Sequence, residues 1–280
     1  MSTIIKSYAN IEFRFVVAVY SEALPIIEYY NLKLINYNHC VNKIYKNKNN
    51  NIWLILSGIG NKKAEKAVNS LYEISNLNHN ALWINIGIAG HATFNPGQLY
   101  EIKKVIYIKN DKNFYYSNSL LNCFEMHECC SVDIQEKAFK DNYIYEMESY
   151  GFIKTVEKNC LREHICILKI ISDNAKSKPA SYKSFAYKYI KKNIEIINKG
   201  LVNYAKEIKK NDLDYSGIMN VLNQKYHITF YNNKKIENLI PKLMIIMGYN
   251  SIINEIECSK SLKNLINSFE EKLKSYILKI

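Results

Sequence analysis

Two acidic residues stand close together in the stretch 143–151, which reads "YIYEMESYG". Glu146 and Glu148 are two positions apart, with Met147 between them. In a β-strand alternate side chains share a face, so the two carboxylates could point the same way, whereas in a helix residues two apart do not face each other. Paired carboxylates can bind hydroxyl groups or transfer protons. Taken alone, the stretch is more typical of a strand end that leads into the solvated first turn of a helix, where acids suit the helix dipole.

Short apolar runs predict the strands that would position such acids. They are rich in β-branched and aromatic residues, as in strands that are covered on both faces. The runs are residues 13–20, 52–57, 81–90 and 165–172. Helical patterns lie between them at 61–74 and 149–159, and Ser21 is the predicted N-cap of a further helix. Strands that alternate with helices predict an α/β domain with a largely parallel sheet.

Polar residues and glycines follow these predicted strands. The set comprises Glu22, "SGIG" at 57–60, "GIAGH" at 87–91 and the pair Ser172 and Asp173. Ligands of open α/β sheets sit beyond the carboxyl ends of the strands, and glycines there let backbone amides approach a ligand. Each turn alone is a weak signal, and Ser172-Asp173 alone would be interpreted as the cap of a following helix. Together with Glu148, which also follows a predicted strand, these residues make three carboxylates and two glycine turns at one edge, which predict a ligand site.

The charge of the chain does not favour nucleic acid as a partner. The 280 residues carry a formal net charge of +12, but Arg14 and Arg162 are the only arginines in the sequence. Base and phosphate recognition favours the planar guanidinium group, so we expect no nucleic-acid partner. No apolar stretch is long enough to span a bilayer, and no signal-peptide cleavage site is evident at the N-terminus. We therefore expect a cytoplasmic protein without membrane contact.

The cysteines are typical of reduced thiols. There are seven, an odd number, and no Cys-x-x-Cys pair occurs. The stretch 123–130, "CFEMHECC", places His127 among three cysteines, which would suit zinc. No second matched pair of ligands accompanies it, so we expect no metal and predict buried small apolar side chains beside a polar loop.

The character of the chain changes near residue 211. Beyond it no buried strand run occurs, and an apolar stripe at helical spacing extends over 262–277. Pro241 lies in another candidate helix, where we expect it to cause a kink or to start a turn. The predicted organisation is an α/β domain at 1–210 and a helical extension at 211–280. We expect this extension to pack on the α/β domain or on a partner, because so continuous a stripe is rarely left in water.

Taken in order, these motifs resemble the nucleoside phosphorylase superfamily, and within it the 5′-methylthioadenosine/S-adenosylhomocysteine nucleosidases. The resembling segments are "AVYSEAL", "LILSGIGNKKA", "INIGIAGHATFNPGQL", "YEMESYG" and "ILKIISDNA", and the match as a whole covers about residues 13–208. The resemblance implies a mixed, largely parallel central sheet flanked by helices in a three-layer α/β/α fold. It also implies hydrolysis of the N-glycosidic bond of a 5′-substituted adenosine-type nucleoside to free base and sugar, without cofactor or metal.

The same resemblance implies a role for each site residue. Glu148 would accept hydrogen bonds from the ribose hydroxyls and Met147 would pack under the sugar. Asp173 would protonate the leaving purine, with Ser172 holding it in orientation, while Glu22 would orient and deprotonate water. An ionised carboxylate suits a diol because it can accept two hydroxyl donors.

The glycine turns contribute the remaining expected contacts, and one of them departs from the family pattern. Ile88, Ala89 and Gly90 would lie against the substrate, although family members usually carry Ser or Thr where Ile88 stands and Gly where His91 stands. The loss of that hydroxyl leaves the preferred substrate open. Supporting roles are expected for three further residues, Glu146, Ser57 and Gly58.

A related hydrolase that acts on another purine nucleoside, such as futalosine, stays possible because "GIAG" also suits that branch, and two further functions stay open. A phosphorylase would use phosphate instead of water, but neither arginine falls at a predicted strand end. A non-catalytic nucleoside sensor would explain the altered glycine turn and the C-terminal extension, although Glu22, Glu148 and Asp173 are all present. The resemblance further implies a homo-oligomer, with the aromatic-rich stretch 113–124 as the candidate interface.

Overall fold

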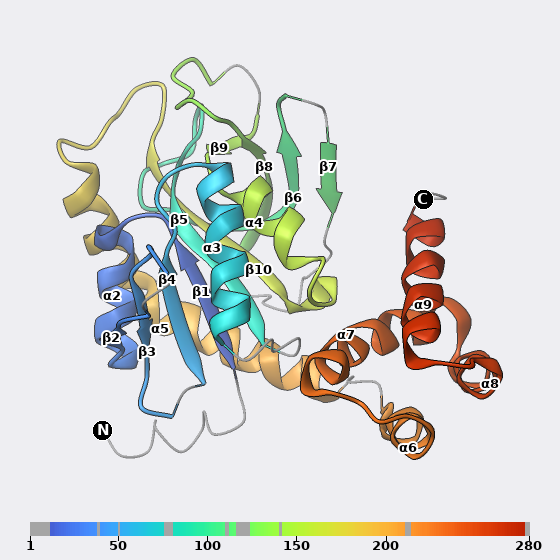
Figure 1. The fold of residues 1–280 in the computed structure, drawn as a ribbon. Helices are drawn as coiled ribbons and strands as arrows, with labels where there is room; N and C mark the ends of the chain where they lie inside the picture. Colours follow the sequence, from blue (N-terminus) through green and yellow to red (C-terminus); the bar gives the residue numbers. More distant parts are fainter. Residues whose placement is uncertain are drawn as a thin grey trace. The chain divides into compact units, whose positions relative to one another are not determined.

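The protein consists of two compact units, Met1–Lys210 and Asn211–Ile280 (Figure 1). A computed structural model describes residues 12–37, 40–49, 51–75, 81–109, 112–115, 124–139, 142–210 and 214–277. Most of the stretch 113–124, our candidate interface, lies outside these residues, so the homo-oligomer stays a prediction.

A ten-stranded sheet forms the centre of the first unit. Its strands are β1 (Phe13–Val17), β2 (Lys33–Ile35), β3 (Ile44–Lys46), β4 (Ile52–Leu56), β5 (Leu82–Gly90), β6 (Leu99–Tyr107), β7 (Lys112–Tyr115), β8 (Glu125–Ser131), β9 (Ile144–Glu146) and β10 (Ile165–Asp173). The strand order is β10-β6-β8-β9-β5-β1-β4-β3-β2, and β7 pairs with β6.

The four strands predicted from apolar runs are neighbours in the sheet. β4, β1, β5 and β10 are parallel, with Phe13 opposite both Ile52 and Leu82, and Ile165 opposite Trp83. Because they run in the same direction, their carboxyl ends meet at one edge. The prediction of a largely parallel sheet is right for this group.

The rest of the sheet differs from that prediction. β10 also pairs with β6, antiparallel, and the path through β8 and β9 returns to β5 at Gly90 and Tyr145. Strands β5, β9, β8, β6 and β10 therefore close a five-stranded barrel. The pairings of β2, β3 and β7 are antiparallel as well. The strands outside the parallel group are short or carry charged residues, so no apolar run in the sequence indicates them.

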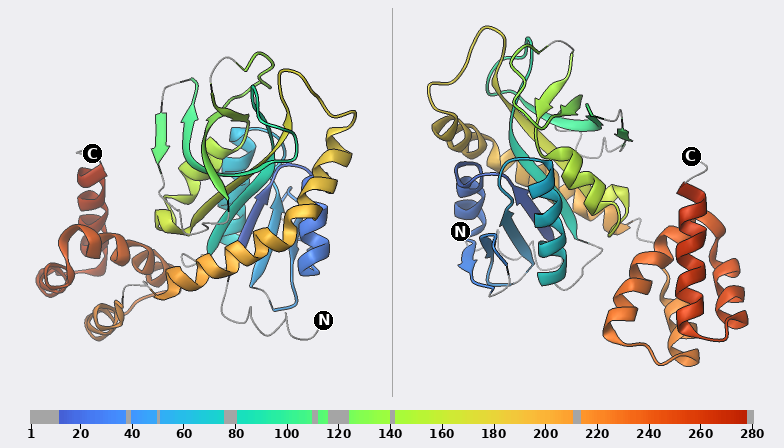
Figure 2. Two further views of the ribbon diagram at one scale, coloured as in Figure 1. Left: turned by 180° about the vertical axis from the view of Figure 1, so that it is seen from behind. Right: turned by 45° about the horizontal axis from the view of Figure 1, so that its top comes forward.

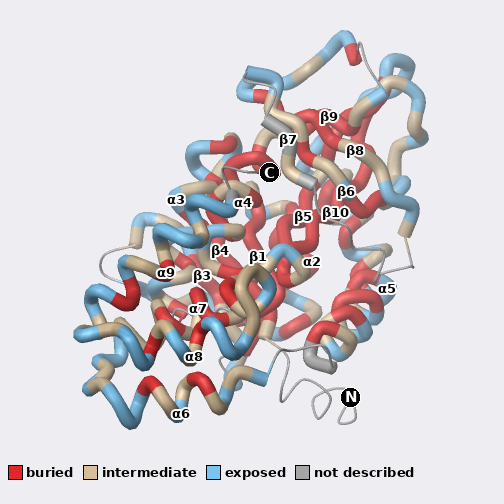
Figure 3. Tube along the Cα trace, turned by 90° about the vertical axis from the view of Figure 1, so that its right-hand side faces the viewer, coloured by how far each residue is buried: buried red, intermediate tan, exposed pale blue. Residues whose placement is uncertain are grey.

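Helices cover both faces of the sheet (Figure 2). α2 (Tyr20–Tyr30) and the long α5 (Tyr182–Lys210) pack together on one face, and α3 (Asn61–Ile74) and α4 (Ser149–Val156) on the other. A short 3-10 helix, η3 (Arg162–His164), precedes β10. Buried residues gather along the strands between these layers (Figure 3).

The start of α2 differs from the expected cap. The helix begins at Tyr20 with Val19 as its N-cap residue, so Ser21 lies inside the first turn. The side chain of Glu22 reaches back and accepts a hydrogen bond from the Val19 N–H at 3.3 Å. This carboxylate therefore satisfies the N–H of the N-cap residue, whereas a serine cap would accept an N–H of the first turn.

The second unit is helical and has its own apolar core. Its helices are α6 (Ser216–Lys225), α7 (Phe230–Met247), α8 (Tyr249–Cys258) and α9 (Leu262–Ile277). Buried residues of all four form one cluster that includes Leu222, Ile240, Ile256 and Phe269. Pro241 lies inside α7, which continues past it to Met247, so it does not start a turn. What this unit packs against stays a prediction. Among the described residues, no helix is long and apolar enough to cross a membrane.

Candidate active site

A cavity of about 830 Å³ lies at the carboxyl ends of β1, β5 and β10. Nine residues singled out in the sequence line it: Glu22, Ile88, Ala89, Gly90, Glu146, Met147, Glu148, Ser172 and Asp173. The two other expected residues, Ser57 and Gly58, are not among its lining. Their N–H groups donate to Val17 and Ala18, which extends the pairing of β4 with β1 beyond the strand end.

Glu22 enters the cavity from the first turn of α2. Its Oε1 accepts a hydrogen bond of 2.9 Å from the Ile88 N–H, and the carboxylate is buried. Gly87 makes this approach possible, because a Cβ atom there would lie 3.0 Å from Oε1. Burial raises the pKa of Glu22, while the backbone N–H groups and the charge of Lys169 act in the opposite direction. A buried carboxylate with a raised pKa can accept a proton near neutral pH.

Glu148 is held by the first turn of α3. Its Oε1 accepts a hydrogen bond of 2.9 Å from the N–H of Gly60, the N-cap residue of that helix. Gly60 has φ 110°, a backbone conformation that residues other than glycine rarely adopt. Burial, followed by the charge of Glu146, raises the pKa of Glu148 to about 7.

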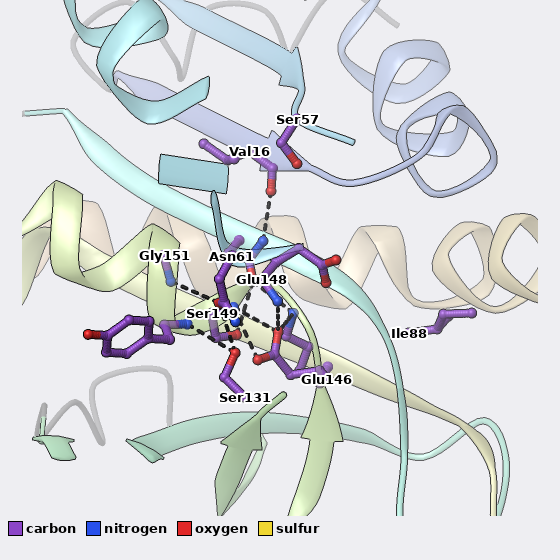
Figure 4. A network of polar contacts seen from close by, with 12 residues as sticks. Val16, Ser57, Asn61, Ile88, Ser131, Glu146, Glu148, Ser149 and Gly151 are labelled. Carbon is purple, nitrogen blue, oxygen red and sulfur yellow. Dashed lines mark hydrogen bonds and ion pairs between the residues drawn. The ribbon is translucent and has the colours of Figure 1, made fainter. Parts of the chain in front are cut away.

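Glu146 lies beneath Glu148 and organises the turn between them (Figure 4). Its carboxylate accepts the N–H of Glu148 at 3.0 Å and the N–H of Ser149 at 2.8 Å. It also forms a fully buried ion pair of 2.8 Å with Lys169. Burial alone would raise the pKa of Glu146, but the charge of Lys169 and these hydrogen bonds hold it below the ordinary value.

A second set of hydrogen bonds joins the helices around this turn. The side-chain oxygen of Asn61, the first residue of α3, accepts from the hydroxyl of Ser131 and from the N–H of Gly151, both at 3.0 Å. Figure 4 shows Asn61, Ser131 and Gly151 beside the Glu146 turn, and Ile88 apart from this network. The contact of Ile88 with Glu22 uses its backbone, so a hydroxyl at that position is not needed for it.

Asp173 ends β10 and lies opposite Gly90. Its Oδ1 is within hydrogen-bonding distance of the Ser172 hydroxyl, which also lies 3.1 Å from the carbonyl oxygen of Ala89. The next helix begins only at Tyr182, so this pair is not a helix cap. The Tyr182 side chain lies beside Asp173 in the cavity wall.

Several residues around the cavity were missed in the sequence. Lys169 and Asn85 are single polar residues inside the apolar runs 165–172 and 81–90, and a buried polar side chain requires a partner. A polar residue that interrupts an apolar run is therefore the sequence signal that indicates Lys169 and Asn85. Phe139 lines the cavity and packs against Gly90, where a Cβ atom would lie 2.5 Å from its ring. Its φ of 46° is unusual for a bulky residue, and no pattern in the sequence indicates that Phe139 lies in the cavity wall.

Neither a metal cluster nor an arginine for phosphate is found among the described residues of the cavity, although Lys183 is in its lining. The described part of the chain contains no group of three or more side chains suited to a metal ion. Cys129 and Cys130 are buried at the end of strand β8, just before the polar loop that follows Ser131, as expected for small apolar side chains beside a polar loop. Arg14 is buried in β1, where it donates to the hydroxyl of Ser75 at 2.8 Å, and Arg162 lies in η3; neither lines the cavity.

Solved structures resemble this arrangement, although no family model and no curated protein matches the sequence. The 5′-methylthioadenosine/S-adenosylhomocysteine nucleosidase of Campylobacter jejuni aligns with a TM-score of 0.55 at 16% identity, covering 68% of this chain and 98% of that chain. The native futalosine hydrolase of Helicobacter pylori aligns with a TM-score of 0.51 at 16% identity, covering 70% and 98%.

A ligand complex is among these similar structures. The Neisseria meningitidis 5′-methylthioadenosine/S-adenosylhomocysteine nucleosidase in complex with methylthio-immucillin-A aligns with a TM-score of 0.52 at 16% identity, covering 70% of this chain and 99% of that chain. In each case nearly the whole neighbour is matched while about a third of this chain is left over. At such low identity the likeness concerns the fold. The chain therefore shares the fold of these solved nucleosidases and of futalosine hydrolase.

Proposed function

We propose that the protein hydrolyses the N-glycosidic bond of a 5′-substituted adenosine-type nucleoside and releases free base and sugar. The observation that carries this proposal is the meeting of Glu22, Glu148 and Asp173 in one cavity. They come from three distant parts of the chain, and each is buried. The pKa of Glu148 is raised by burial and also by the charges of Glu146 and Glu22, and buried acids gathered in one cavity are typical of functional sites.

Each carboxylate suits one requirement of the reaction. Breaking an N-glycosidic bond passes through an oxocarbenium-like sugar, which requires a protonated leaving base and a nucleophile on the opposite face. Asp173, with the Ser172 hydroxyl beside it, is the proposed acid for the purine. Glu22 is the proposed base for water, and Glu148 the acceptor for the ribose diol. Met147, next to Glu148 in the cavity wall, would pack under the sugar.

The charge of the cavity favours water over phosphate. Phosphorolysis needs cations around a phosphate ion. Lys169, the cation beside the carboxylates, already bonds to Glu146 and Asn85, and Lys183, the lysine in the cavity lining, is exposed to solvent. A phosphate ion next to Glu22 and Glu148 would meet two carboxylates instead. Hydrolysis is therefore the better fit to these residues.

Part of the cavity lining suits a 5′ substituent. It consists of Leu24, Ile59, Tyr20 and Tyr187, which are apolar or aromatic, and Tyr20 and Ile59 are half-exposed. The volume of about 830 Å³ lies in the upper part of the range of about 300–1,000 Å³ that is usual for small-molecule sites. A bare nucleoside would leave this part unfilled, whereas an apolar group on the 5′ carbon would bury it.

The test is a panel of purine nucleosides, with and without phosphate, in which free base and sugar are measured. We expect release of base with free sugar, independent of phosphate, and the fastest release from 5′-substituted adenosines. Glu22→Gln should abolish turnover while binding persists. Glu65→Gln is the control, because Glu65 pairs with Lys154 between α3 and α4 and is not in the cavity lining.

Two outcomes would replace this proposal. Release of base that requires phosphate, with ribose 1-phosphate as product, would show a phosphorylase. Binding of adenine nucleosides without release of base under any condition would show a sensor.

A further inference from the structure

His91 directly follows strand β5, and its buried side chain holds the loop of residues 91–98 (the His91 loop). Its Nδ1 accepts hydrogen bonds of 3.1 Å from the N–H of Thr93 and 3.1 Å from the N–H of Phe94. Only an unprotonated Nδ1 can accept them, so the ring proton is on Nε2, which donates to Asn142 Oδ1 at 3.1 Å. Burial lowers the pKa of His91 and favours this neutral ring. One ring nitrogen therefore holds the loop, and the other anchors the ring.

The imidazole of His91 also packs against the loop. It is stacked on the ring of Phe94, with centroids 3.6 Å apart and an angle of 10° between the planes, and His127 of β8 meets it edge-on at 5.4 Å. Glycine, which the resembling family usually carries at this position, could make neither the stack nor the hydrogen bonds. The departure from the family pattern therefore has a structural result, because in this chain a side chain fixes the loop.

The His91 loop in turn holds the end of β10, where Asp173 lies. The N–H of His91 donates to the carbonyl oxygen of Asp173 at 3.1 Å, and the side chain of Asn174 donates to the carbonyl oxygen of Phe94 at 2.8 Å. The N–H of Ala175 donates to a further carbonyl oxygen of the loop at 3.2 Å. Three consecutive residues are thus bonded to the loop. The backbone position of Asp173 therefore depends on the conformation that His91 gives to the loop.

We propose that His91 is a positioning residue for the hydrolysis, which fixes the His91 loop and through it holds Asp173, the proposed acid, against the leaving base. This inference rests on the proposed function, because it takes Asp173 as the acid. His91 lies outside the described cavity lining and acts through the loop, not on the reacting atoms. A misplacement of about 1 Å can cost about 100-fold in rate, so this hold on Asp173 matters for turnover.

The first test compares His91→Phe with His91→Asn. Phenylalanine keeps a ring for the stack but has a carbon in place of Nδ1, whereas asparagine places Oδ1 there, which can accept the N–H two residues further on. In His91→Phe we expect kcat to fall by about 10- to 100-fold with little change in KM. His91→Asn should recover most of this loss. His127→Phe is the matched control and should keep the wild-type kcat, because the N–H groups of Thr93 and Phe94 donate to His91 and not to this neighbouring ring. A folded His91→Phe with the wild-type kcat, or a His91→Asn as slow as His91→Phe, would overturn the inference.

A second variant covers the case in which His91→Phe does not fold. In Asn174→Ser the hydroxyl can still accept the N–H groups of Lys176 and Ser177, as the Asn174 side-chain oxygen does, but it is too short to reach the carbonyl oxygen of Phe94. This change breaks the same link from the β10 side. We therefore expect kcat to fall with little change in KM, and a wild-type kcat in this variant would contradict the proposal.

Amide hydrogen exchange measured by NMR separates this inference from the proposed function, because it needs no turnover. In His91→Phe the N–H of residue 91, which donates to Asp173, and the backbone N–H of Asn174 should exchange faster than in the wild type. The N–H of Leu82 at the other end of β5, which donates to Glu12 at 2.8 Å, should exchange at the wild-type rate. An unchanged rate at Asn174, or an equal acceleration at Leu82, would mean that His91 only stabilises the fold. If the wild type releases no base but Asn174 does exchange faster in the variant, the proposed function fails while the hold of His91 on the end of β10 stands.

Discussion

Nucleoside affinity should depend on pH through Glu148. The pKa of this carboxyl group is raised to about 7, first by burial and then by the charge of Glu146. The ribose diol donates two hydroxyl groups, which an ionised carboxylate can accept and a protonated acid can accept only in part. Affinity should therefore be highest above pH 7 and fall as the pH drops below it.

The size of the loss in affinity follows from the proton that Glu148 must release when the nucleoside binds. Below pH 7 each unit costs about tenfold in affinity, or about 1.4 kcal/mol, because the ionised fraction falls in the same proportion. At pH 5 the affinity should be about 100-fold below its plateau. For comparison, a carboxyl group with the ordinary pKa of 4.5 would be mostly ionised over this whole range.

Calorimetric titration with a C-nucleoside measures this dependence, because the carbon–carbon glycosidic bond of such a ligand is not hydrolysed. Glu148→Gln should bind more weakly and show a flatter profile. Glu22→Gln is the necessary control, since the pKa of Glu22 is also raised by burial. A 2′-deoxy analogue, which donates one hydroxyl fewer, should show a smaller slope. If the wild-type affinity were constant from pH 5 to 8, ionised Glu148 would not be the ribose acceptor.

Three further predictions test the acid, the helix contact and a buried carboxyl group outside the cavity. Asp173→Asn should lower kcat by about two to four orders of magnitude with little change in KM, measured as release of base, and an unchanged kcat would exclude Asp173 as the acid. Gly151→Ala should destabilise the fold by about 3 kcal/mol in urea titration, because its Cβ would lie 1.9 Å from the backbone oxygen of Asn61; Lys154→Ala on the same helix is the control. Burial raises the pKa of Glu101 to about 8, so the folded state keeps a proton that the unfolded chain releases near pH 4.5. Stability should therefore fall as the pH rises from about 4.5 through 8, and Glu101→Gln should flatten this dependence in thermal unfolding; equal slopes for both proteins would contradict it.

The parallel part of the fold could be predicted because β1, β4, β5 and β10 are covered on both faces and leave unbroken apolar runs. The barrel could not, because β6 contains Lys103 and Lys104 and β8 contains acidic residues, so neither resembles a buried strand. Strand pairing also depends on contacts between distant segments, which local patterns do not encode.

The position of the candidate site, at the carboxyl ends of the strands, could also be predicted from the sequence. Parallel strands bring their carboxyl ends to one edge, so residues that follow them are neighbours whatever their separation in the chain. The partners of those residues were harder to find. Gly60 acts through its backbone N–H, which has no residue-type signal, and the choice of Glu148 as its acceptor depends on how α3 and α4 pack.

The place of β10 in the sheet has a consequence for synthesis of the chain. β10 is the last strand to be made, yet it lies between β5 and β6, which are both complete by Tyr107. Translation at about 5–20 residues per second leaves these two edges unpaired for several seconds before residue 173 follows. Exposed strand edges recruit other chains, so this interval is the period of greatest aggregation risk. Nascent chains stalled between Tyr107 and Ile165 should therefore bind chaperones more strongly than chains stalled after Asp173.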